Sequence, residues 1–336
     1  MNEKKVILLV NTGSPDAPDK KNLGKYLRQF LMDAHIIDIP WFFRFLLVNL
    51  IIVPFRANRS AEYYKKIWTK SGSPLKFITE SLVKKLNSQK REFSFYFAMR
   101  YGNPSIKNQI NELYEKGFRN ITLFPMFPHY SYSTFESVID EFRKCIEKFP
   151  EIQYQIAAPF YNHKEYIKSL SEISKKYLTK DIEHVLISYH SIPERHLKRV
   201  NKLCLSSQDC CETMSIAHAR CYKHQIMETS RLFVKKSGID TKKFTIAFQS
   251  AMSSKGWLVP DTEKVIKELA EKGIKNLAII SPGFTIDNLE TLDELNIRYK
   301  KVFLDAGGKK FQYIPALNDN MIWVESLQRL LKSNWN

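Results

Sequence analysis

One histidine and three acids in the second half of the chain have the types and spacing that proton transfer or metal binding requires. His190 ends one apolar run, and a later run is followed at positions i, i+3 and i+7 by Asp287, Glu290 and Glu294. On a helix, this spacing aligns three carboxylates in one stripe. A histidine can accept a proton near neutral pH or bind a metal, and facing acids can relay protons or guide a cation. Alternatively, the histidine has only a structural role, and the acids only stabilise the helix by their interaction with its dipole.

An internal repeat indicates how these residues are positioned. Residues 111–127 resemble residues 267–283 at a constant offset of 156. Each copy predicts a helix that ends at Gly117 or Gly273 and is followed by a short buried strand. Two weaker matches extend the repeat over nearly the whole chain: 5–10 with 184–189, at an offset of 179, and 154–159 with 311–315.

Apolar runs alternate with helical patterns in both halves, which is the order of elements in an α/β fold. The runs are continuously apolar, so they predict parallel strands that helices cover on both faces. We therefore expect two duplicated, doubly wound domains, each with a four-stranded parallel sheet flanked by helices. The expected strands lie near residues 5–11, 94–101, 121–127 and 154–160, and near 184–190, 244–250, 276–282 and 311–316.

The repeat also predicts the domain boundaries. We expect an N-terminal domain at residues 1–165 and a C-terminal domain at 166–310, which carries the histidine, the acids and a cysteine-rich insert at about 197–222. Residues 311–336 should add the last strand and helix at the domain junction. Ligands of such sheets bind beyond the carboxyl ends of the strands, so we expect the site in the cleft between the domains.

The two copies differ in the residues that could do chemistry. At the offset of 156, the first half has Ser131, Thr134 and Val138 in place of the three acids. At the offset of 179, Asn11 takes the place of His190. Features that both halves share serve the common fold, so these differences favour a functional site in the second half.

Loops 128–134 and 249–258 are rich in aromatic and hydroxyl side chains. These residues could line a flat aromatic ligand, or they could close a domain interface. The sequence contains no dinucleotide-binding, P-loop, zincin or nucleophile-elbow motif, so those functions lack their usual support.

Four of the five cysteines fall within 18 residues: Cys204, Cys210, Cys211 and Cys221. In a reducing cytoplasm, such a cluster favours a [2Fe–2S] centre or zinc over disulfides, with incidental thiols as the alternative. The pattern C-x5-C-C-x9-C is not that of a ferredoxin or a zinc ribbon. His218 or His224 could replace one of the two adjacent cysteines, and the distant Cys145 is expected to be a core thiol.

Length and composition describe an ordinary globular protein. The chain has 336 residues, 44% hydrophobic and 26% charged, which is enough for about two domains. A net charge of +17 favours anionic partners, but no basic helix or aromatic RNA platform accompanies it, so nucleic acid is not expected. The short apolar run at 6–10 is unlike that of a signal peptide, which predicts a cytoplasmic protein.

The most apolar segment, residues 40–54, is interrupted by Arg44 and Asn49 and is shorter than the ~20 residues of a spanning helix. We therefore do not expect it to cross a bilayer. It is either a buried helix or an exposed apolar lip that touches a membrane or admits an apolar substrate.

Taken in order, several short motifs resemble those of the ferrochelatases, which insert ferrous iron into a porphyrin in the last step of haem formation. Each motif is weak alone, but their order is specific and the match runs nearly end to end. The motifs are Leu9–Pro15, Gly72–Leu75, Met99–Gly102, Phe127–Ser131, Ser188–Arg195, Phe248–Ser250, Gly256–Trp257 and Pro282–Leu292.

The resemblance implies a lyase that inserts Fe²⁺ into protoporphyrin IX and releases two protons. His190 and Glu290 match the paired active-site residues that contact the iron, and Asp287 and Glu294 continue an acidic path. The matching substrate-binding positions are Arg100, Tyr101, Tyr130, Ser131 and Trp257. Porphyrin propionates need cations, for which the candidates are Lys65, Lys66 and Arg100.

The resemblance also bears on the cysteines and on the apolar segment. Some bacterial ferrochelatases carry an internal cysteine segment that binds a [2Fe–2S] cluster, which implies the same for the four clustered cysteines here. Residues 40–55 fall where the family has the lip of its porphyrin mouth, which favours peripheral membrane contact, at the inner face of the membrane.

Two other functions fit part of the pattern. A related chelatase would use coproporphyrin, sirohydrochlorin or another metal such as cobalt, and we expect shorter chains with more histidines for that class. A porphyrin or haem carrier would also have two α/β domains around a cleft. A carrier has no need of acids beside His190, so we expect an enzyme, with His190 accepting pyrrole protons and Glu290 helping to move protons or metal.

Overall fold

The computed structural model describes residues 5–333, except 90–92, 201, 203, 206, 208 and 254. Parts of the expected 1–165 domain, the 197–222 insert and the 311–336 segment therefore lie outside the described residues. The chain divides into two compact units, one of Met1–Phe127 with Tyr132–Ala158 and one of Pro128–Ser131 with Pro159–Asn336.

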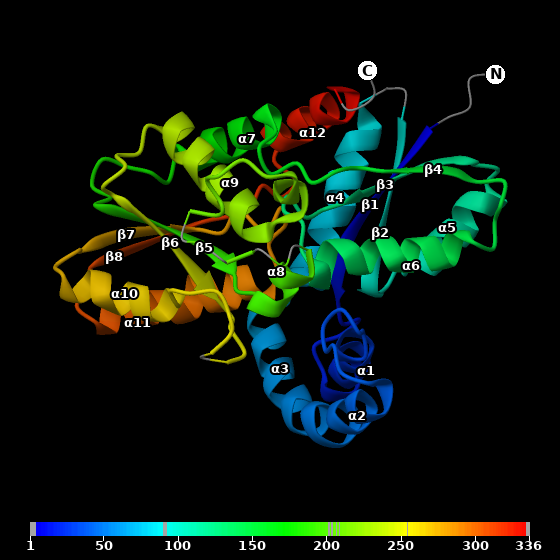
Figure 1. The fold of residues 1–336 in the computed structure, drawn as a ribbon, viewed down its shortest axis with the longest axis horizontal. Helices are drawn as coiled ribbons and strands as arrows, with labels where there is room; N and C mark the ends of the chain where they lie inside the picture. Colours follow the sequence, from blue (N-terminus) through cyan, green and yellow to red (C-terminus); the bar gives the residue numbers. More distant parts are fainter. Residues whose placement is uncertain are drawn as a thin grey trace. The chain divides into compact units, whose positions relative to one another are not determined.

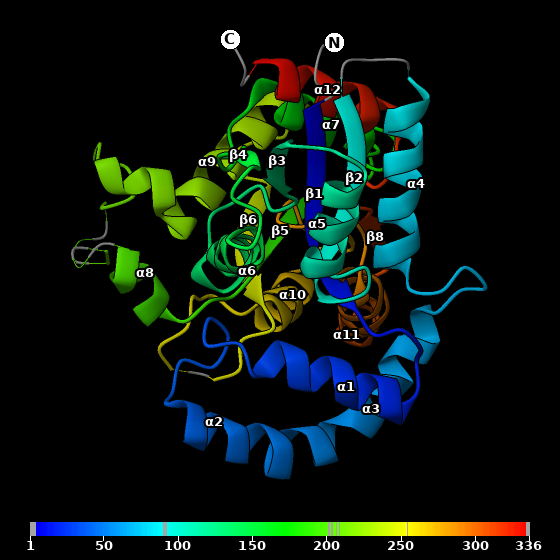
Figure 2. The ribbon, with the colours of Figure 1, turned by 90° about the vertical axis from the view of Figure 1, so that its right-hand side faces the viewer.

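The first unit contains a parallel sheet with the strand order β2-β1-β3-β4. Its strands are β1 (Lys5–Ser14), β2 (Phe93–Gly102), β3 (Asn120–Pro125) and β4 (Gln153–Ile156). Its helices are α1 (Lys20–Leu31), α2 (Trp41–Leu46), π-helix η1 (Leu47–Ile52), α3 (Val53–Ile67), α4 (Pro74–Ser88), α5 (Ile106–Glu115), π-helix η2 (Tyr132–Glu136) and α6 (Ser137–Ile146). Helix α4 runs alongside β1 and β2, while α1, α2 and α3 gather beyond the carboxyl end of β1 (Figure 2).

The second unit contains a parallel sheet with the strand order β6-β5-β7-β8. Its strands are β5 (His184–His190), β6 (Phe244–Gln249), β7 (Asn276–Ile280) and β8 (Lys310–Ile314). Its helices are α7 (Lys164–Ser174), α8 (Glu194–Val200), 3₁₀ helix η3 (Ile216–Arg220), α9 (Tyr222–Ser237), α10 (Thr262–Glu271), π-helix η4 (Glu290–Arg298), α11 (Tyr299–Asp305) and α12 (Met321–Ser333). The sheet lies between α7 and α9 on one face and α10 and α11 on the other (Figure 1).

Local sequence explains why these elements form where they do. Residues 6–10 are aliphatic and fully buried, as a central parallel strand requires. Helices α1 and α10 begin after Asp19 and Asp261, whose carboxylates accept the backbone N–H three residues later, at 3.0 Å in each case. Helices α5 and α10 are each followed, just after the C-cap residue, by a glycine with a positive φ angle, Gly117 at 82° and Gly273 at 94°.

The predicted fold class and internal repeat are confirmed. Both sheets have the same strand order, and the register is matched, because Asn11 pairs with Met99 and His190 pairs with Gln249. All eight strands lie within a few residues of their expected positions. A π-helix follows the third strand of each sheet, which the sequence pattern did not predict.

The boundary between the units falls after Ala158 rather than after 165. Phe160 explains this, because it packs against Tyr166 of α7 and Trp323 of α12, both in the second unit. The segment expected at a domain junction, 311–336, belongs to the second unit, since β8 pairs with β7.

Candidate active site

His190 is the last residue of β5, and its imidazole has a defined tautomer. Its Nδ1 lies 2.6 Å from the carbonyl oxygen of Ser191. A carbonyl can only accept, so Nδ1 carries the proton and the neutral ring keeps a lone pair on Nε2. The backbone is also held, because the hydroxyl of Tyr222 on α9 donates to the His190 carbonyl at 2.9 Å. Tyr222 lies 32 residues away along the chain, and no local sequence pattern points to it.

Glu290, the first residue of η4, faces that lone pair. Its Oε1 lies 4.0 Å from Nε2 of His190, and both side chains are 38% exposed. Removal from water and the negative charge of Glu294 raise the pKa of Glu290, while His190 opposes the shift. The backbone N–H of Glu290 is fixed by a 2.9 Å hydrogen bond to the Asn288 side chain.

Glu294 lies on the same π-helix and is nearly buried. Its Oε2 accepts a hydrogen bond from the Ser250 hydroxyl at 2.6 Å, and its Oε1 accepts one from the Tyr299 hydroxyl at 2.8 Å. Arg298 Nη2 lies 3.4 Å from Oε2, while its Nε binds Asp293 at 2.8 Å. The structure thus brings Glu290 and Glu294 onto one π-helix, in place of the regular helical stripe expected for all three acids.

Asp287 precedes η4 and has a different environment. It is buried, and its carboxylate accepts hydrogen bonds from the Tyr313 hydroxyl, Thr291 Oγ1 at 2.9 Å, the Ala316 N–H at 3.2 Å and Asn318 Nδ2 at 2.7 Å. These contacts tie the start of η4 to the segment after β8. An anchoring role accounts for them, and the acidic path through Asp287 stays a prediction.

The aromatic candidates of the second unit are also anchored. Tyr130 and Ser131 are buried, with the Tyr130 N–H donating to Gln225 Oε1 at 2.7 Å and Arg220 donating to the Tyr130 hydroxyl at 3.1 Å. Trp257 is half-buried and its backbone is bridged to Pro193, three residues after His190. Their binding of substrate stays a prediction.

In the first unit, Arg100 and Tyr101 meet at a residue that the sequence analysis missed. Asp33 Oδ2 accepts hydrogen bonds from Arg100 Nη2 at 2.6 Å, from the Tyr101 hydroxyl at 2.7 Å and from Ser137 Oγ at 2.6 Å. Burial opposes ionisation, but hydrogen bonds from His35 and the charge of Arg100 hold the pKa of Asp33 well below its usual range. No local pattern reveals this cluster, because its members lie 67 to 104 residues from Asp33.

Lys65 and Lys66 lie in the last turn of α3. Lys65 pairs with Glu62 at 2.8 Å and is 56% exposed, and the Lys66 ammonium lies 5.2 Å from the centre of the Tyr63 ring. Contacts of this kind on the surface are weak, so either lysine could turn to an anionic ligand at little cost. Propionate binding by these residues stays a prediction.

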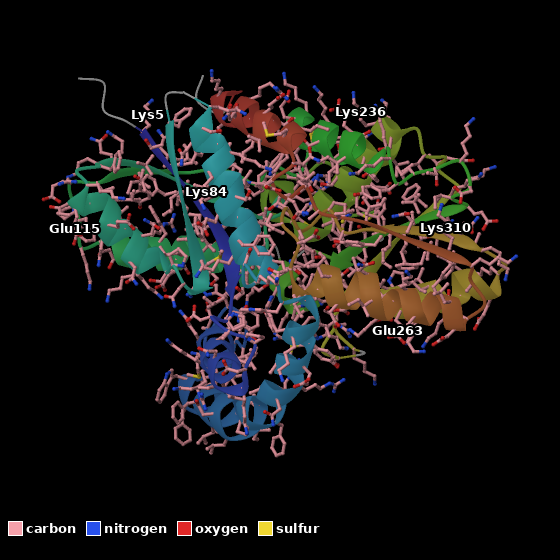
Figure 3. The ribbon with its side chains drawn as sticks, turned by 180° about the vertical axis from the view of Figure 1, so that it is seen from behind. Lys5, Lys84, Glu115, Lys236, Glu263 and Lys310 are labelled. Carbon is pink, nitrogen blue, oxygen red and sulfur yellow. The ribbon has the colours of Figure 1, made fainter. Side chains whose placement is uncertain are left out.

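The apolar segment is an exposed lip rather than a buried helix. Trp41–Ile67 is one continuous helical run of 27 residues with a hydropathy of 1.3 over its most apolar window, long and apolar enough to span a membrane by length and composition. Only 22% of that window is buried. Aromatic side chains project outward from it (Figure 3). Its large apolar residues that are more than half exposed are Trp41, Phe42, Phe43, Leu50, Ile51 and Phe55.

The four clustered cysteines form a group of thiols in the second unit. Cys204 and Cys211 both hydrogen-bond to the sulfur of Cys221, and the bond from Cys211 lowers the pKa of Cys221. Cys204, Cys210 and Cys221 line a cavity of about 340 Å³. Among the described residues, no three His, Cys, Asp or Glu side chains are placed to hold a single metal ion.

The neighbouring histidines have other partners. His218 Nε2 lies 3.2 Å from the Cys210 carbonyl oxygen, and His224 Nδ1 lies 2.7 Å from that of Cys211. Their rings stack with centroids 3.6 Å apart. The cysteines remain the better candidates for ligands, and Cys145 is buried in α6 as expected for a core thiol.

Comparison with known proteins identifies the family. Residues 4–335 match the family model described as Ferrochelatase. The chain is 37% identical over 329 residues to the ferrochelatase of Pseudomonas fluorescens (strain Pf0-1), covering 96% of each protein. It is 36% identical over 332 residues to that of Azotobacter vinelandii (strain DJ / ATCC BAA-1303), covering 97% of this chain and 98% of the relative.

A similar solved structure is SirB from Bacillus subtilis with Fe³⁺, with a TM-score of 0.58, 10% identity and coverage of 98% of this chain and 95% of that chain. At this identity the likeness supports the chelatase-like fold alone. The sequence matches go further: the chain belongs to the ferrochelatase family, the lyases of haem synthesis that insert iron into a porphyrin.

Proposed function

We propose that this chain inserts Fe²⁺ into protoporphyrin IX, with His190 as the acceptor of pyrrole protons and Glu290 as the group that passes them on. The observation that carries this assignment is the 4.0 Å approach of Glu290 Oε1 to a His190 Nε2 whose lone pair is left available by the Nδ1 bond to Ser191. Iron insertion releases two pyrrole protons, so the site needs a base that can pass on the first proton before it accepts the second.

The neighbouring acids provide a route by which His190 can release its proton. When Nε2 accepts a proton, the imidazolium gains a carboxylate partner in Glu290. Removal from water raises the pKa of Glu290, which makes its carboxylate a better proton acceptor. The 4.0 Å gap suits one intervening water or a small turn of the ring, and the 38% exposure of Glu290 lets the proton leave to solvent.

The same pair can meet iron as a substrate. Imidazole nitrogen and carboxylate oxygen are both ligands that ferrous iron accepts. Within the part of the chain that the structure describes, no third His, Cys, Asp or Glu completes a metal site with them. Two donors hold iron weakly, which suits a cation that has to be handed to a porphyrin.

An anaerobic assay tests the function. Purified protein is mixed with protoporphyrin and Fe²⁺, and loss of porphyrin fluorescence reports metal insertion. We expect catalytic turnover. A protein that binds the porphyrin with 1:1 stoichiometry but never metalates it would be a carrier. Faster turnover with coproporphyrin or sirohydrochlorin would change the substrate while leaving the chemistry intact.

We further propose that Cys204, Cys210, Cys211 and Cys221 hold a [2Fe–2S] cluster. Support comes from the hydrogen bonds of Cys204 and Cys211 to the sulfur of Cys221, and from the cavity that Cys204, Cys210 and Cys221 line. Such a cluster takes two cysteines for each of two irons, so it needs two pairs of thiols rather than three ligands around one ion. When bound, it supplies a one-electron redox couple.

The cluster proposal predicts a visible iron–sulfur absorption band in protein purified without oxygen. Changing Cys204 or Cys221 to serine should abolish this band, because each removes a thiolate ligand. The matched control is Cys145→Ser, which removes the core thiol of α6 and should leave the band intact. Colourless protein with stoichiometric zinc would contradict the proposal.

The exposed lip supports a third proposal, that the protein is cytoplasmic and touches the inner face of the membrane peripherally. Helix α3 buries Val53, Ala57 and Ala61 within the first unit, and α1 packs against it. The buried guanidinium of Arg44 donates to the carbonyl oxygens of Ile37 and Ile39, both at 2.9 Å. These contacts build the helix into the unit and leave one apolar face for a lipid surface.

Sedimentation with lipid vesicles checks this contact. The triple change of Trp41, Phe43 and Phe55 to serine should sharply reduce the fraction of protein that sediments, because each side chain is more than 60% exposed and apolar. The control is Leu304→Ser, which alters an exposed apolar residue of α11. Equal sedimentation of the triple variant and the unaltered protein would contradict the proposed membrane contact.

A further inference from the structure

Ser250, which directly follows β6, has a backbone conformation that serine rarely adopts. Its φ angle is +60°, in the left-handed region that costs energy unless the surroundings enforce it. The preceding Gln249 is fully buried and accepts a hydrogen bond from the Ser188 hydroxyl of β5. The strand end is therefore fixed, and the left-handed turn after it brings the Ser250 hydroxyl within 2.6 Å of Glu294 Oε2.

The partners of Glu294 leave it little freedom. Ser250 holds one carboxylate oxygen and Tyr299 of α11 holds the other. Arg298 lies 3.4 Å from the oxygen that Ser250 holds and is itself tied to Asp293. The carboxylate is 11% exposed, so it is a nearly buried charge whose orientation is set by Ser250 from the loop after β6 and by Tyr299, where η4 continues into α11.

In both units, the side chain at the repeat position of Ser250 contacts the helical segment that follows the third strand. The matched registers of Asn11 with Met99 and of His190 with Gln249 make Arg100 the counterpart of Ser250. Arg100 Nε donates to Ser137 Oγ at 2.8 Å, at the start of α6. The second unit thus has a small hydroxyl where the first has a guanidinium, and this hydroxyl is aimed at an acid of the proposed relay.

We infer that Ser250 is a positioning residue for iron insertion: with Tyr299, it fixes the Glu294 carboxylate beside Glu290. This inference rests on the proposed function, because it concerns the same relay. A carboxylate that is oriented in advance stabilises positive charge as it develops on His190 and the incoming iron, without having to reorganise during the reaction. The left-handed backbone is the conformational cost of that orientation.

Three variants separate the hydroxyl from the backbone. Ser250→Gly relieves the strain but removes the donor, so we expect the melting temperature to change little while kcat falls about 10- to 100-fold, as for a misplaced catalytic group. Ser250→Ala removes the donor and keeps the strained backbone. Nothing then offsets the lost hydrogen bond, so both kcat and the melting temperature should fall. Ser250→Asn tolerates the left-handed conformation and can donate from its amide, so it should recover most of the lost kcat.

The control is Ser253→Gly, which makes the same change in the same loop at a hydroxyl that accepts from the Lys255 N–H at 3.3 Å. It should retain normal kcat. Normal kcat in Ser250→Gly would overturn the inference, and so would a loss that only follows the melting temperature or is confined to the KM for porphyrin. If His190→Ala also kept its activity, the proposed function itself would fail. If only Ser250→Gly did so, the role of Ser250 alone would fail.

Discussion

Replacement of His190 by alanine is expected to lower kcat for iron insertion by about 100- to 10,000-fold, the usual contribution of a positioned general base. The change removes the Nε2 lone pair that lies 4.0 Å from Glu290, while the strand that carries it stays paired with β6 and β7. Initial rates with Fe²⁺ and protoporphyrin under anaerobic conditions measure the loss.

A second histidine on the same strand provides the matched control. His184 begins β5, and its Nε2 lies 2.9 Å from Thr245 Oγ1. His184→Ala should reduce stability but leave kcat near normal. Porphyrin binding, followed by fluorescence, should persist in His190→Ala, because the change leaves the porphyrin-binding candidates in place. A kcat above one tenth of the normal value would show that His190 is not the proton acceptor.

The largest expected loss of stability comes from Asp33→Asn. The amide keeps the shape of the side chain but removes the nearest counter-charge of the Arg100 guanidinium, which is 13% exposed and keeps a longer ion pair with Glu141 at 3.6 Å. Breaking such a nearly buried pair from one side costs about 3–5 kcal/mol of unfolding free energy. For a unit of this size, the corresponding fall in melting temperature is about 6–20 °C.

Thermal unfolding at several pH values checks both the size and the sign of this effect. The folded-state pKa of Asp33 is below its ordinary value of 3.8, so its contribution is present above that pH and is lost as the pH falls further. The difference between the two proteins should therefore be full near neutral pH and shrink in acid. Asp181→Asn, which breaks an exposed pair with Lys310, should change the melting temperature little at any pH. An Asp33→Asn difference that is small, or that grows in acid, would contradict this account.

The strands and their parallel order could be predicted because the signal is local. A central strand such as β1 is a run of buried aliphatic residues, and the repeat supplied the same pattern twice. The pair His190 and Glu290 could be proposed from the asymmetry between the copies. Their 4.0 Å separation joins the end of β5 to the start of η4, which are far apart in the sequence, so no local pattern encodes it.

Other features escaped prediction for physical reasons that can be named. The cluster around Asp33 joins the turn after α1 to β2 and α6 through single side chains, and such contacts leave no periodic pattern. Asp287 fitted a helical stripe, yet three of its donors come from β8 and the residues that follow it, Tyr313, Ala316 and Asn318. A π-helix differs from an α-helix by one residue in its hydrogen-bond spacing, too small a change to show in a pattern of apolar positions.

The π-helices that follow the third strand of each sheet, η2 and η4, carry a consequence for ancestry. Thr134 lies in η2 and Glu290 opens η4, and these residues match at the offset of 156. A distortion inherited by both halves belongs to the single-sheet ancestor, before its gene was copied and fused. The widened turn is therefore older than the differences between the halves, one of which came to carry Glu290 on it while the other came to carry Thr134 at the matching position.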